Sequence, residues 1–292
     1  MKTIKKGLIC LTLLLPCISC TKKEKLLIGG AGWPQIAIID KASGEIEWSH
    51  PLTPEEECYD VDMTPDGEIL YAFKLGAKLI TRSHETVWTY EVNESEALYS
   101  ATCLESGNYL LGIAGYPARI VELDRNGTPV KELSFQTATP ELKRQFRHIL
   151  KTAQNTYLLP MIDKHKVLEI NESGKAINSV YCGGEPVSVA VAENGNWLVT
   201  GGDTPYIMEF DPKSHSAVRT VETKDISYGA LMYVGELIPY KNGNVLITNW
   251  DGRSNEKTQP VLLEIDPDNK VVWRLPFLPK IFNISTADSF FE

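Results

Sequence analysis

The chain has 292 residues, of which 43% are hydrophobic, and its formal net charge is −9. This length accommodates one large β domain or two ordinary domains, and the hydrophobic fraction is typical of a globular protein. Without the three lysines among the first 19 residues the charge becomes −12, which argues against a basic surface for nucleic acid or for anionic lipid.

The first 19 residues have the pattern of a secretory signal peptide. Three lysines precede an apolar run over 7–16, which is too short to span a bilayer. Ser19-Cys20 resembles the lipobox of bacterial lipoproteins, although Cys17 stands where that pattern usually has leucine. We therefore expect lipidation of Cys20, a tether over 20–25, and an anchor in the outer membrane of a bacterial cell envelope, on its periplasmic or outer face. Secretion without a lipid is the alternative.

The mature chain keeps three cysteines besides Cys20, namely Cys58, Cys103 and Cys182. Their spacing, and the absence of a nearby Cys or His pair, indicates no zinc site. An oxidising compartment would permit one disulfide among them.

A repeated pattern runs along the rest of the chain. A two-residue turn followed by a short apolar strand occurs as DGEILYAF (66–73), SGNYLLGI (106–113), QNTYLLPM (154–161), NGNWLVTG (194–201) and NGNVLITN (242–249). Asp-Gly and Asn-Gly turns join antiparallel strands because Gly and Asn tolerate positive φ. One strand precedes each of these and two follow it, which is the composition of a propeller blade.

The predicted second strands of these units begin at blade-sized intervals of 40–48 residues. They start near Leu26, Ile69, Tyr109, Tyr157, Trp197 and Val245. The first unit lacks an inner strand, and a strand-like run around 284–290 has no unit of its own. We therefore predict an all-β, six-bladed β-propeller over residues 26–292, one domain whose C-terminal strand completes the first blade and removes two exposed edges. The insertion at 137–146 is expected to contain a short helix.

The third strand, turn and fourth strand of each unit resemble a known repeat. IIDKASGEIEWSH (38–50) and EIDPDNKVVWRLPF (264–277) are similar to the repeats of pyrroloquinoline-quinone-like propellers, in which an apolar strand, an Asp and a short turn precede a strand with Trp. The NGN-apolar strands also resemble those of bacterial arylsulfotransferases and related six-bladed propeller lipoproteins. The resemblance covers residues 25–292 and implies the architecture, whereas it implies no particular activity.

Sulfuryl transfer, which the likeness to arylsulfotransferases implies, resembles chemistry at a histidine nucleophile supported by further His and Arg. Four of the five histidines are expected in outer strands or turns, or before a third strand: His50, His84, His165 and His215. Only Arg147 and His148 lie where an inner strand begins, near the axial funnel. They are the candidate catalytic residues. The alternative to catalysis is that they contact a ligand or lie in a solvated turn.

Other catalytic chemistry lacks its usual residues. Quinone enzymes stack the cofactor on Trp beside a Ca²⁺ site, whereas Trp48, Trp88 and Trp273 share one outer-strand position and are predicted to pack between blades. We expect no cofactor and no metal. The sequence does not exclude a pair of carboxylates that cleaves glycosides. The alternative role for the aspartates in question is capping of loops. The candidates on one ring face are Asp60, Asp163, Asp203, Asp225 and Asp251.

Propeller ligands bind where the second-to-third strand loops and the inter-blade loops converge on the axis, and pockets favour aromatic side chains with a few polar groups. Three of these loops combine Gly, Pro and an aromatic residue. The predicted ligand-binding residues are Trp33, Tyr59, Tyr99, Tyr116, Arg147, His148, Asp203, Tyr206, Tyr228 and Trp250. Packing of the aromatic rings against neighbouring blades is the alternative.

Together these patterns favour a monomeric, envelope-anchored binding or scaffold module without catalytic activity, whose ligand is a carbohydrate, a peptide, another small molecule or a protein partner. The alternative is a propeller-class enzyme, for sulfuryl transfer or carbohydrate cleavage, that uses the axial funnel. Carboxylates meeting Arg147 and His148 in a deep funnel would favour the enzyme, and a plugged channel would favour the binding module.

Overall fold

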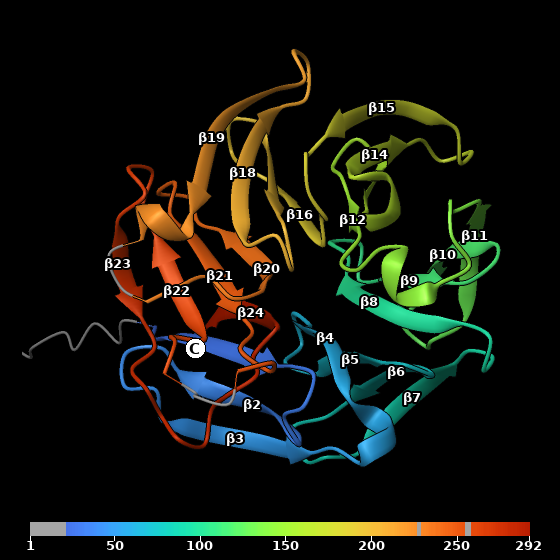
Figure 1. Cartoon of the computed structure of the whole chain (residues 1–292). Coiled ribbons are helices and arrows are strands. Elements are labelled where there is room, and N and C mark those ends of the chain that lie inside the picture. The colour runs from blue at the N-terminus through green and yellow to red at the C-terminus, as the bar shows by residue number, and fades with distance from the viewer. Residues whose placement is uncertain (1–21, 227–228, 255–257) are drawn as a thin grey trace, which may run out of the picture.

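The computed structural model describes residues 22–226, 229–254 and 258–292, whose strands form six four-stranded antiparallel sheets. The sheets are arranged as blades around a central axis (Figure 1). This confirms the predicted six-bladed propeller. The predicted signal peptide and Cys20 lie outside the described residues.

Each blade runs from an inner to an outer strand. Blade 1 contains β24 (Thr286–Phe291), β1 (Glu24–Gly29), β2 (Gln35–Asp40) and β3 (Ile46–Pro51). Blade 2 contains β4 (Cys58–Met63), β5 (Ile69–Phe73), β6 (Gly76–Ile80) and β7 (Thr86–Glu91). Blade 3 contains β8 (Ala97–Cys103), β9 (Tyr109–Ala114), β10 (Ala118–Leu123) and β11 (Pro129–Phe135).

The second half of the ring repeats this order. Blade 4 contains β12 (Leu150–Lys151), β13 (Tyr157–Met161), β14 (Lys166–Ile170) and β15 (Ala176–Tyr181). Blade 5 contains β16 (Ser188–Val191), β17 (Trp197–Thr200), β18 (Tyr206–Asp211) and β19 (Ser216–Glu222). Blade 6 contains β20 (Val234–Pro239), β21 (Val245–Asn249), β22 (Leu262–Ile265) and β23 (Val271–Arg274). Short 3-10 helices lie between strands: η1 (Pro54–Glu56), η2 (Leu142–Arg144), η3 (Ile162–Lys164) and η4 (Thr223–Asp225).

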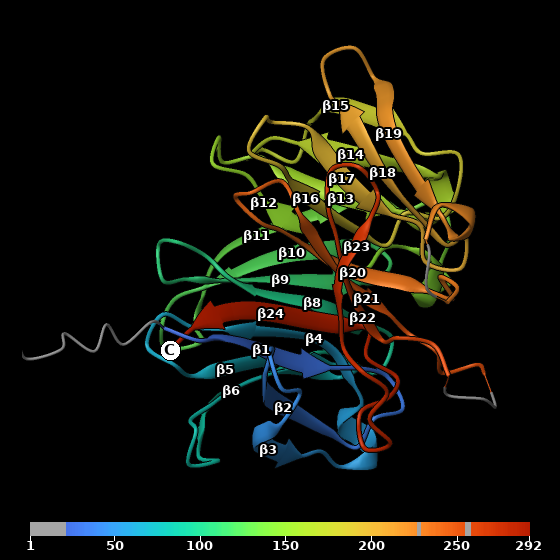
Figure 2. The ribbon, with the colours of Figure 1, turned by 90° about the vertical axis from the view of Figure 1, so that its left-hand side faces the viewer.

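Strand β24 closes the ring. It pairs antiparallel with β1, Glu24 lying opposite Phe291 and Gly29 opposite Thr286, so chain segments from the two ends share one sheet (Figure 2). The predicted closure by the C-terminal strand is therefore confirmed. Helix η2 also confirms the short helix expected in the insertion at 137–146.

The core consists of six clusters, each lying between two neighbouring blades. Successive residues of a second strand contribute to different clusters: Leu26 and Ile28 face blade 6, whereas Leu27 faces blade 2. Because both faces of a blade are buried, its second strand is a continuous apolar run rather than an alternating one. For this reason the second strands are the easiest to locate in the sequence, and five of the six begin at the predicted residue.

A β-bulge recurs between the third and fourth strands of all six blades. The register shifts at 38/39, 79/80, 122/123, 169/170, 209/210 and 264/265. A bulge increases the local twist, which turns the outer strand over the next blade. Trp48 and Trp88 follow this bulge and contact the next blade, through a hydrogen bond from Nε1 to Arg82 O (2.8 Å) and a 5.0 Å ring contact with Tyr109. Their predicted packing between blades is confirmed.

A buried lysine adds polar contacts where the ring closes. Lys41 Nζ lies within hydrogen-bond distance of Glu24 (2.9 Å) and of Glu264 (2.7 Å) and Tyr240 (3.1 Å) in blade 6. Burial alone would raise the pKa of Glu24, but hydrogen bonds from Tyr240, Lys41 and Ser289 lower it below its ordinary value. Lys41 therefore links blades 1 and 6 through an ion pair with a glutamate of each blade.

No helix in the described parts of the chain is long and apolar enough to cross a membrane.

We predict that Lys41→Met lowers the free energy of unfolding by about 3 kcal/mol at pH 7, because it leaves the buried carboxylate of Glu264 and the partly buried one of Glu24 without their cation. A carboxyl group with a lowered folded pKa contributes stability above its unfolded pKa and loses it as the pH falls. The difference between variant and wild type should therefore shrink from pH 5 to pH 3, measured by urea denaturation. Lys131→Met, which removes an exposed pair with Glu172, should change stability by less than about 1 kcal/mol at any pH.

Candidate functional site

Neighbouring blades are joined near the axis by hydrogen bonds at all six junctions. In order around the ring these bonds run from Val61 N to Thr286 Oγ1 (3.1 Å), Ala101 N to Asp60 Oδ2 (2.9 Å), Ile149 N to Ser100 Oγ (3.1 Å), His148 N to Val187 O (3.0 Å), Thr200 Oγ1 to Gly235 O (2.5 Å) and Ala287 N to Glu236 Oε2 (2.9 Å). Five of the six use a side-chain acceptor or donor, because the strands of neighbouring blades belong to different sheets. These bonds hold polar side chains at the axis.

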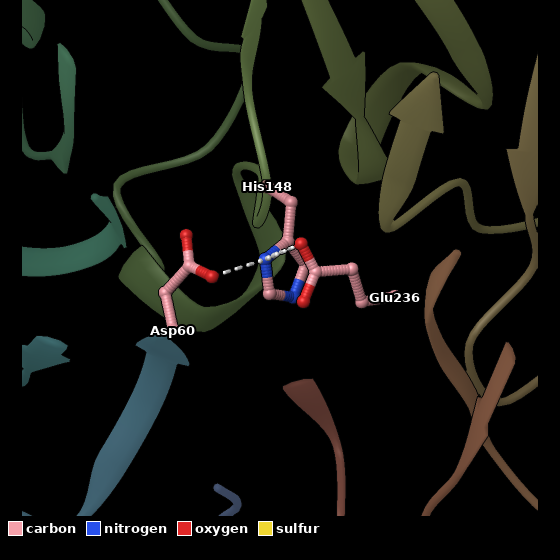
Figure 3. Close-up of side chains that lie close together, drawn as sticks. All are labelled: Asp60, His148 and Glu236. Carbon is pink, nitrogen blue, oxygen red and sulfur yellow. Dashed lines mark ion pairs between the residues drawn. The ribbon is translucent and has the colours of Figure 1, made fainter. Parts of the chain in front are cut away.

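Three of these side chains meet at the centre. Asp60 comes from β4, Glu236 from β20, and His148 from the segment before β12 (Figure 3). His148 Nδ1 lies 3.2 Å from Asp60 Oδ1 and 3.9 Å from Glu236 Oε1. Blades 2, 4 and 6 are not neighbours, so these groups can meet only at the axis.

Both carboxylates are held in place by groups behind them. Asp60 Oδ2 accepts from Ala101 N, and Glu236 Oε2 accepts from Ala287 N (2.9 Å) and from the hydroxyl of Thr286 (2.7 Å). The second oxygen of each carboxylate faces His148, and Asp60 Oδ1 also accepts from the hydroxyl of Thr286 (3.1 Å). The arrangement fixes which oxygen is available at the centre.

The cluster perturbs its own protonation. Burial alone would lower the pKa of His148, but the charges of Asp60 and Glu236 outweigh burial and raise that pKa to about 9. Burial and the charge of Asp60 raise the pKa of Glu236 to about 8, against the opposing effect of His148. At neutral pH the cluster therefore carries an imidazolium ion, which has no lone pair for nucleophilic attack.

A second acidic pair consists of Asp62, two residues beyond Asp60 on β4, and Asp288, two residues beyond Thr286 on β24. Asp62 Oδ2 accepts from Cys103 N (2.6 Å), and Asp288 Oδ2 accepts from Met63 N (3.0 Å). Burial, followed by mutual repulsion for Asp62, raises the pKa of both carboxyl groups. Burial and these carboxyl groups also raise the pKa of the free thiol of Cys103, so it is a poor nucleophile at neutral pH.

Aromatic rings and arginines lie above the centre, where the inner strands begin. The guanidinium of Arg147 stacks 4.0 Å from the ring centre of Tyr99, whose ring lies 5.1 Å from that of Tyr59. Burial raises the pKa of Tyr233 and the nearby Arg147 partly offsets this rise, so Arg147 lies close to Tyr233 as well. Tyr233 makes an edge contact with Trp250 at 5.7 Å.

The first group of predicted binding residues therefore comes together: Tyr59, Tyr99, Arg147 and His148 lie at the axis. Asp203 and Trp250 lie together beside them, because Arg253 pairs with Asp203 and covers the ring of Trp250 at 5.8 Å.

The other predicted binding residues lie elsewhere. Trp33 is 2% exposed and its Nε1 donates to Lys280 O (3.0 Å), and Tyr206 is 4% exposed between blades 4 and 5. Tyr116 is 68% exposed in its loop, and Tyr228 lies outside the described residues. Ligand binding by any of these residues stays a prediction.

The remaining aspartates predicted on this face have local partners. Asp163 accepts from Ala138 N (2.7 Å), Asp225 completes a capping box at η4, and Asp251 Oδ1 accepts from Asn283 N (3.1 Å). These contacts match the alternative role of loop capping.

Glu236, Thr286 and the arginine Arg253 did not emerge from the sequence. The available signal was a charged residue within an otherwise apolar inner strand, as in VGELIP of β20. That signal was weak, because the same pattern describes a solvated edge.

Two hollows lie on the other face of the ring. A hollow of about 480 Å³ is lined by Glu24, Lys41, Tyr240 and neighbours, and one of about 380 Å³ lies among the turns around Asn194 and Asn242. These turns join first to second strands, whereas His148 precedes a first strand, so the hollows open at the end of the ring opposite the axial cluster.

The comparisons with known proteins agree with this architecture. The family model described as "Mal s 1 allergenic protein-like" matches residues 32–270. The chain belongs to this family. A Bacteroides caccae protein of unknown function is similar over 91% of this chain and 98% of its own, with 36% identity and a TM-score of 0.86. A search among curated proteins found no match.

More distant solved structures share the fold alone. A streptogramin B lyase covers 94% of this chain and 96% of its own at 12% identity, with a TM-score of 0.61. A catalytically inactive histidine-to-alanine variant of virginiamycin B lyase from Staphylococcus aureus, with quinupristin, covers 90% of this chain and 87% of its own at 14% identity, with a TM-score of 0.60. The resemblances to quinone-type propellers and arylsulfotransferases are not among these findings and stay predictions.

We predict that Asp62→Asn raises stability at pH 8 by about 1–2 kcal/mol, because the amide keeps the acceptor for Cys103 N and can donate to Asp288. A carboxyl group with a raised folded pKa binds its proton more tightly in the folded state, so its contribution to stability falls as the pH rises through that pKa. The variant should therefore lose less stability than wild type between pH 5 and pH 8 in urea denaturation. An unchanged slope would contradict the raised pKa of Asp62.

Proposed function

We propose that this protein is an envelope-anchored propeller that binds a small molecule carrying a flat ring and an anionic group, without converting it. The observation that supports this proposal is the guanidinium of Arg147 over the ring of Tyr99, beside Tyr59, at the end of the axis where the inner strands begin. A guanidinium group recognises carboxylate, sulfate or phosphate, and aromatic faces contact sugar or aromatic rings.

The guanidinium is oriented before any ligand arrives. Arg147 Nη1 donates to Phe146 O (3.0 Å) while the plane of the group rests on Tyr99. Both contacts limit the rotamers of a long side chain, which reduces the entropy lost on binding. The second aromatic pair, Tyr233 and Trp250, lies near enough to form another wall.

The anchor is part of the same proposal. The lipobox-like Ser19-Cys20 supports attachment to the outer membrane through lipid on Cys20, with the propeller as a monomer. The tether is shorter than the expected 20–25, because Glu24 and Lys25 already belong to β1 and pair with β24. The similarity to a protein from Bacteroides caccae fits a bacterial envelope.

A propeller-class enzyme is the second candidate, because His148 meets two carboxylates at the axis. Two carboxylates beside a histidine can move protons, as sugar cleavage requires, and a lyase is among the proteins that share the fold. Sulfuryl transfer needs His148 as a neutral nucleophile, whereas its raised pKa keeps it protonated at neutral pH. We therefore place binding first.

The test uses 4-nitrophenyl sulfate, 4-nitrophenyl phosphate and glucuronic acid as probes, with binding followed by calorimetry and thermal shift. We expect at least one probe to bind wild type, and Arg147→Gln or Tyr99→Leu to weaken that binding about tenfold, equivalent to about 1.4 kcal/mol. Release of 4-nitrophenol in the presence of a phenol acceptor would instead indicate the enzyme.

Two matched controls separate the site from the rest of the surface. The first control is Arg125→Gln, because Arg125 lies in an exposed turn. The second is Tyr181→Leu, because the ring of Tyr181 is 70% exposed on an outer strand. Both should bind the probe as wild type does. Equal affinity in the Arg147 and Tyr99 variants would refute the proposed binding surface.

A further inference from the structure

The axial cluster contains a donor atom that the protein leaves without a hydrogen bond. His148 is 8% exposed, and its Nδ1 makes no hydrogen bond although it lies 3.2 Å from Asp60 Oδ1. Its contact with Asp60 is an ion pair that lacks hydrogen-bond geometry, and a buried polar atom without a hydrogen bond is costly. This atom points at two carboxylate oxygens (Figure 3), which indicates that a further group belongs between the three.

The spacing of the three donors matches that around one metal ion. One ligand atom from each of Asp60, His148 and Glu236 lies within 4.8 Å of the others. Two ligands bound at about 2.1 Å lie about 3.0–3.4 Å apart in octahedral or tetrahedral geometry. The separation of 3.2 Å between Nδ1 and Asp60 Oδ1 lies in that range, and the separation of 3.9 Å between Nδ1 and Glu236 Oε1 exceeds it by about half an ångström.

The groups behind the donors are those that orient metal ligands. Main-chain N–H groups of Ala101 and Ala287 hold one oxygen of each carboxylate. The other oxygen of each lies beside His148, and that of Asp60 also accepts from the hydroxyl of Thr286 (3.1 Å). Such outer hydrogen bonds are typical of protein metal sites. They also make the ligand atoms rigid, because each of the three residues lies in a segment that is hydrogen-bonded at a blade junction.

We propose that Asp60, His148 and Glu236 bind a first-row transition-metal dication such as Mn²⁺ or Zn²⁺ at the propeller axis. Two carboxylates balance the charge of the ion, and an imidazole ligand favours these metals over Ca²⁺ and Mg²⁺, which prefer oxygen donors. The site differs from the expectation of no metal, because its ligands come from three blades and have no local spacing. It stands independently of the ligand site around Arg147.

The competing explanation is a plain ion pair, in which an imidazolium of His148 bridges the two carboxylates. It predicts the same side-chain positions but no stoichiometric metal uptake. The two explanations therefore differ in a direct binding measurement.

The full-length chain, purified without a histidine tag and stripped with EDTA, is titrated with MnCl₂ and with ZnCl₂, with CaCl₂ and MgCl₂ as comparison ions. All proteins carry His84→Gln, because exposed His50 and His84 bring two Nδ1 atoms within 3.0 Å and can bind metal themselves. We expect one Mn²⁺ or Zn²⁺ per chain, and pulsed electron paramagnetic resonance of the Mn²⁺ form should show coupling to one imidazole nitrogen.

His148→Gln should abolish the nitrogen coupling and weaken binding by at least about a hundredfold. Glu236→Gln keeps an acceptor for Ala287 N and should weaken binding similarly, while His215→Gln, an exposed control, should not. Absence of stoichiometric binding, or binding without nitrogen coupling, overturns the proposal whether or not a variant folds. Probe binding at Arg147 is measured separately, so either proposal can fail alone.

Discussion

The structure depends on closing a ring whose neighbouring blades do not share a sheet. Packing between blades is apolar and supplies most of the stabilisation, but it does not set where one inner strand lies along the next. The hydrogen bonds at the six axial junctions do so, and Asp60 and Glu236 take part in two of them. Polar residues therefore had to be placed at the axis, and the same residues present their second oxygen atoms to His148.

This double use explains why the centre has strongly shifted pKa values. A carboxylate that accepts a main-chain N–H cannot turn away when another charge approaches. His148 is consequently protonated among acids, and Glu236 gains protons more readily than an exposed glutamate. The arrangement suits either a dication or a bridging proton, whereas a free nucleophile fits it poorly. Ligand binding around Arg147 and metal binding by Asp60, His148 and Glu236 are therefore compatible with each other.

The sequence predicted the positions of strands that are buried on both faces. It predicted poorly those site residues that only contacts between distant parts of the chain bring together. Second strands such as Ile69–Phe73 are apolar on both faces, so their starts and the blade count could be predicted. Arg147 and His148 were found because they begin an inner strand. Glu236 was missed because only closure of the ring brings β20 opposite β4. Trp33 looked like a surface residue beside its glycines, but its indole packs in the cluster between blades 1 and 6.

The pairing of β24 with β1 also sets the order of events during synthesis. Strand β1 is among the first segments made, yet its partner is made after every other strand. Contacts between residues so far apart in the chain form slowly, and until they form β1 has an open edge. A nascent chain on the ribosome is therefore an unfinished ring, and exposure of that edge marks any chain that stops before residue 286 as a target for chaperones or proteases.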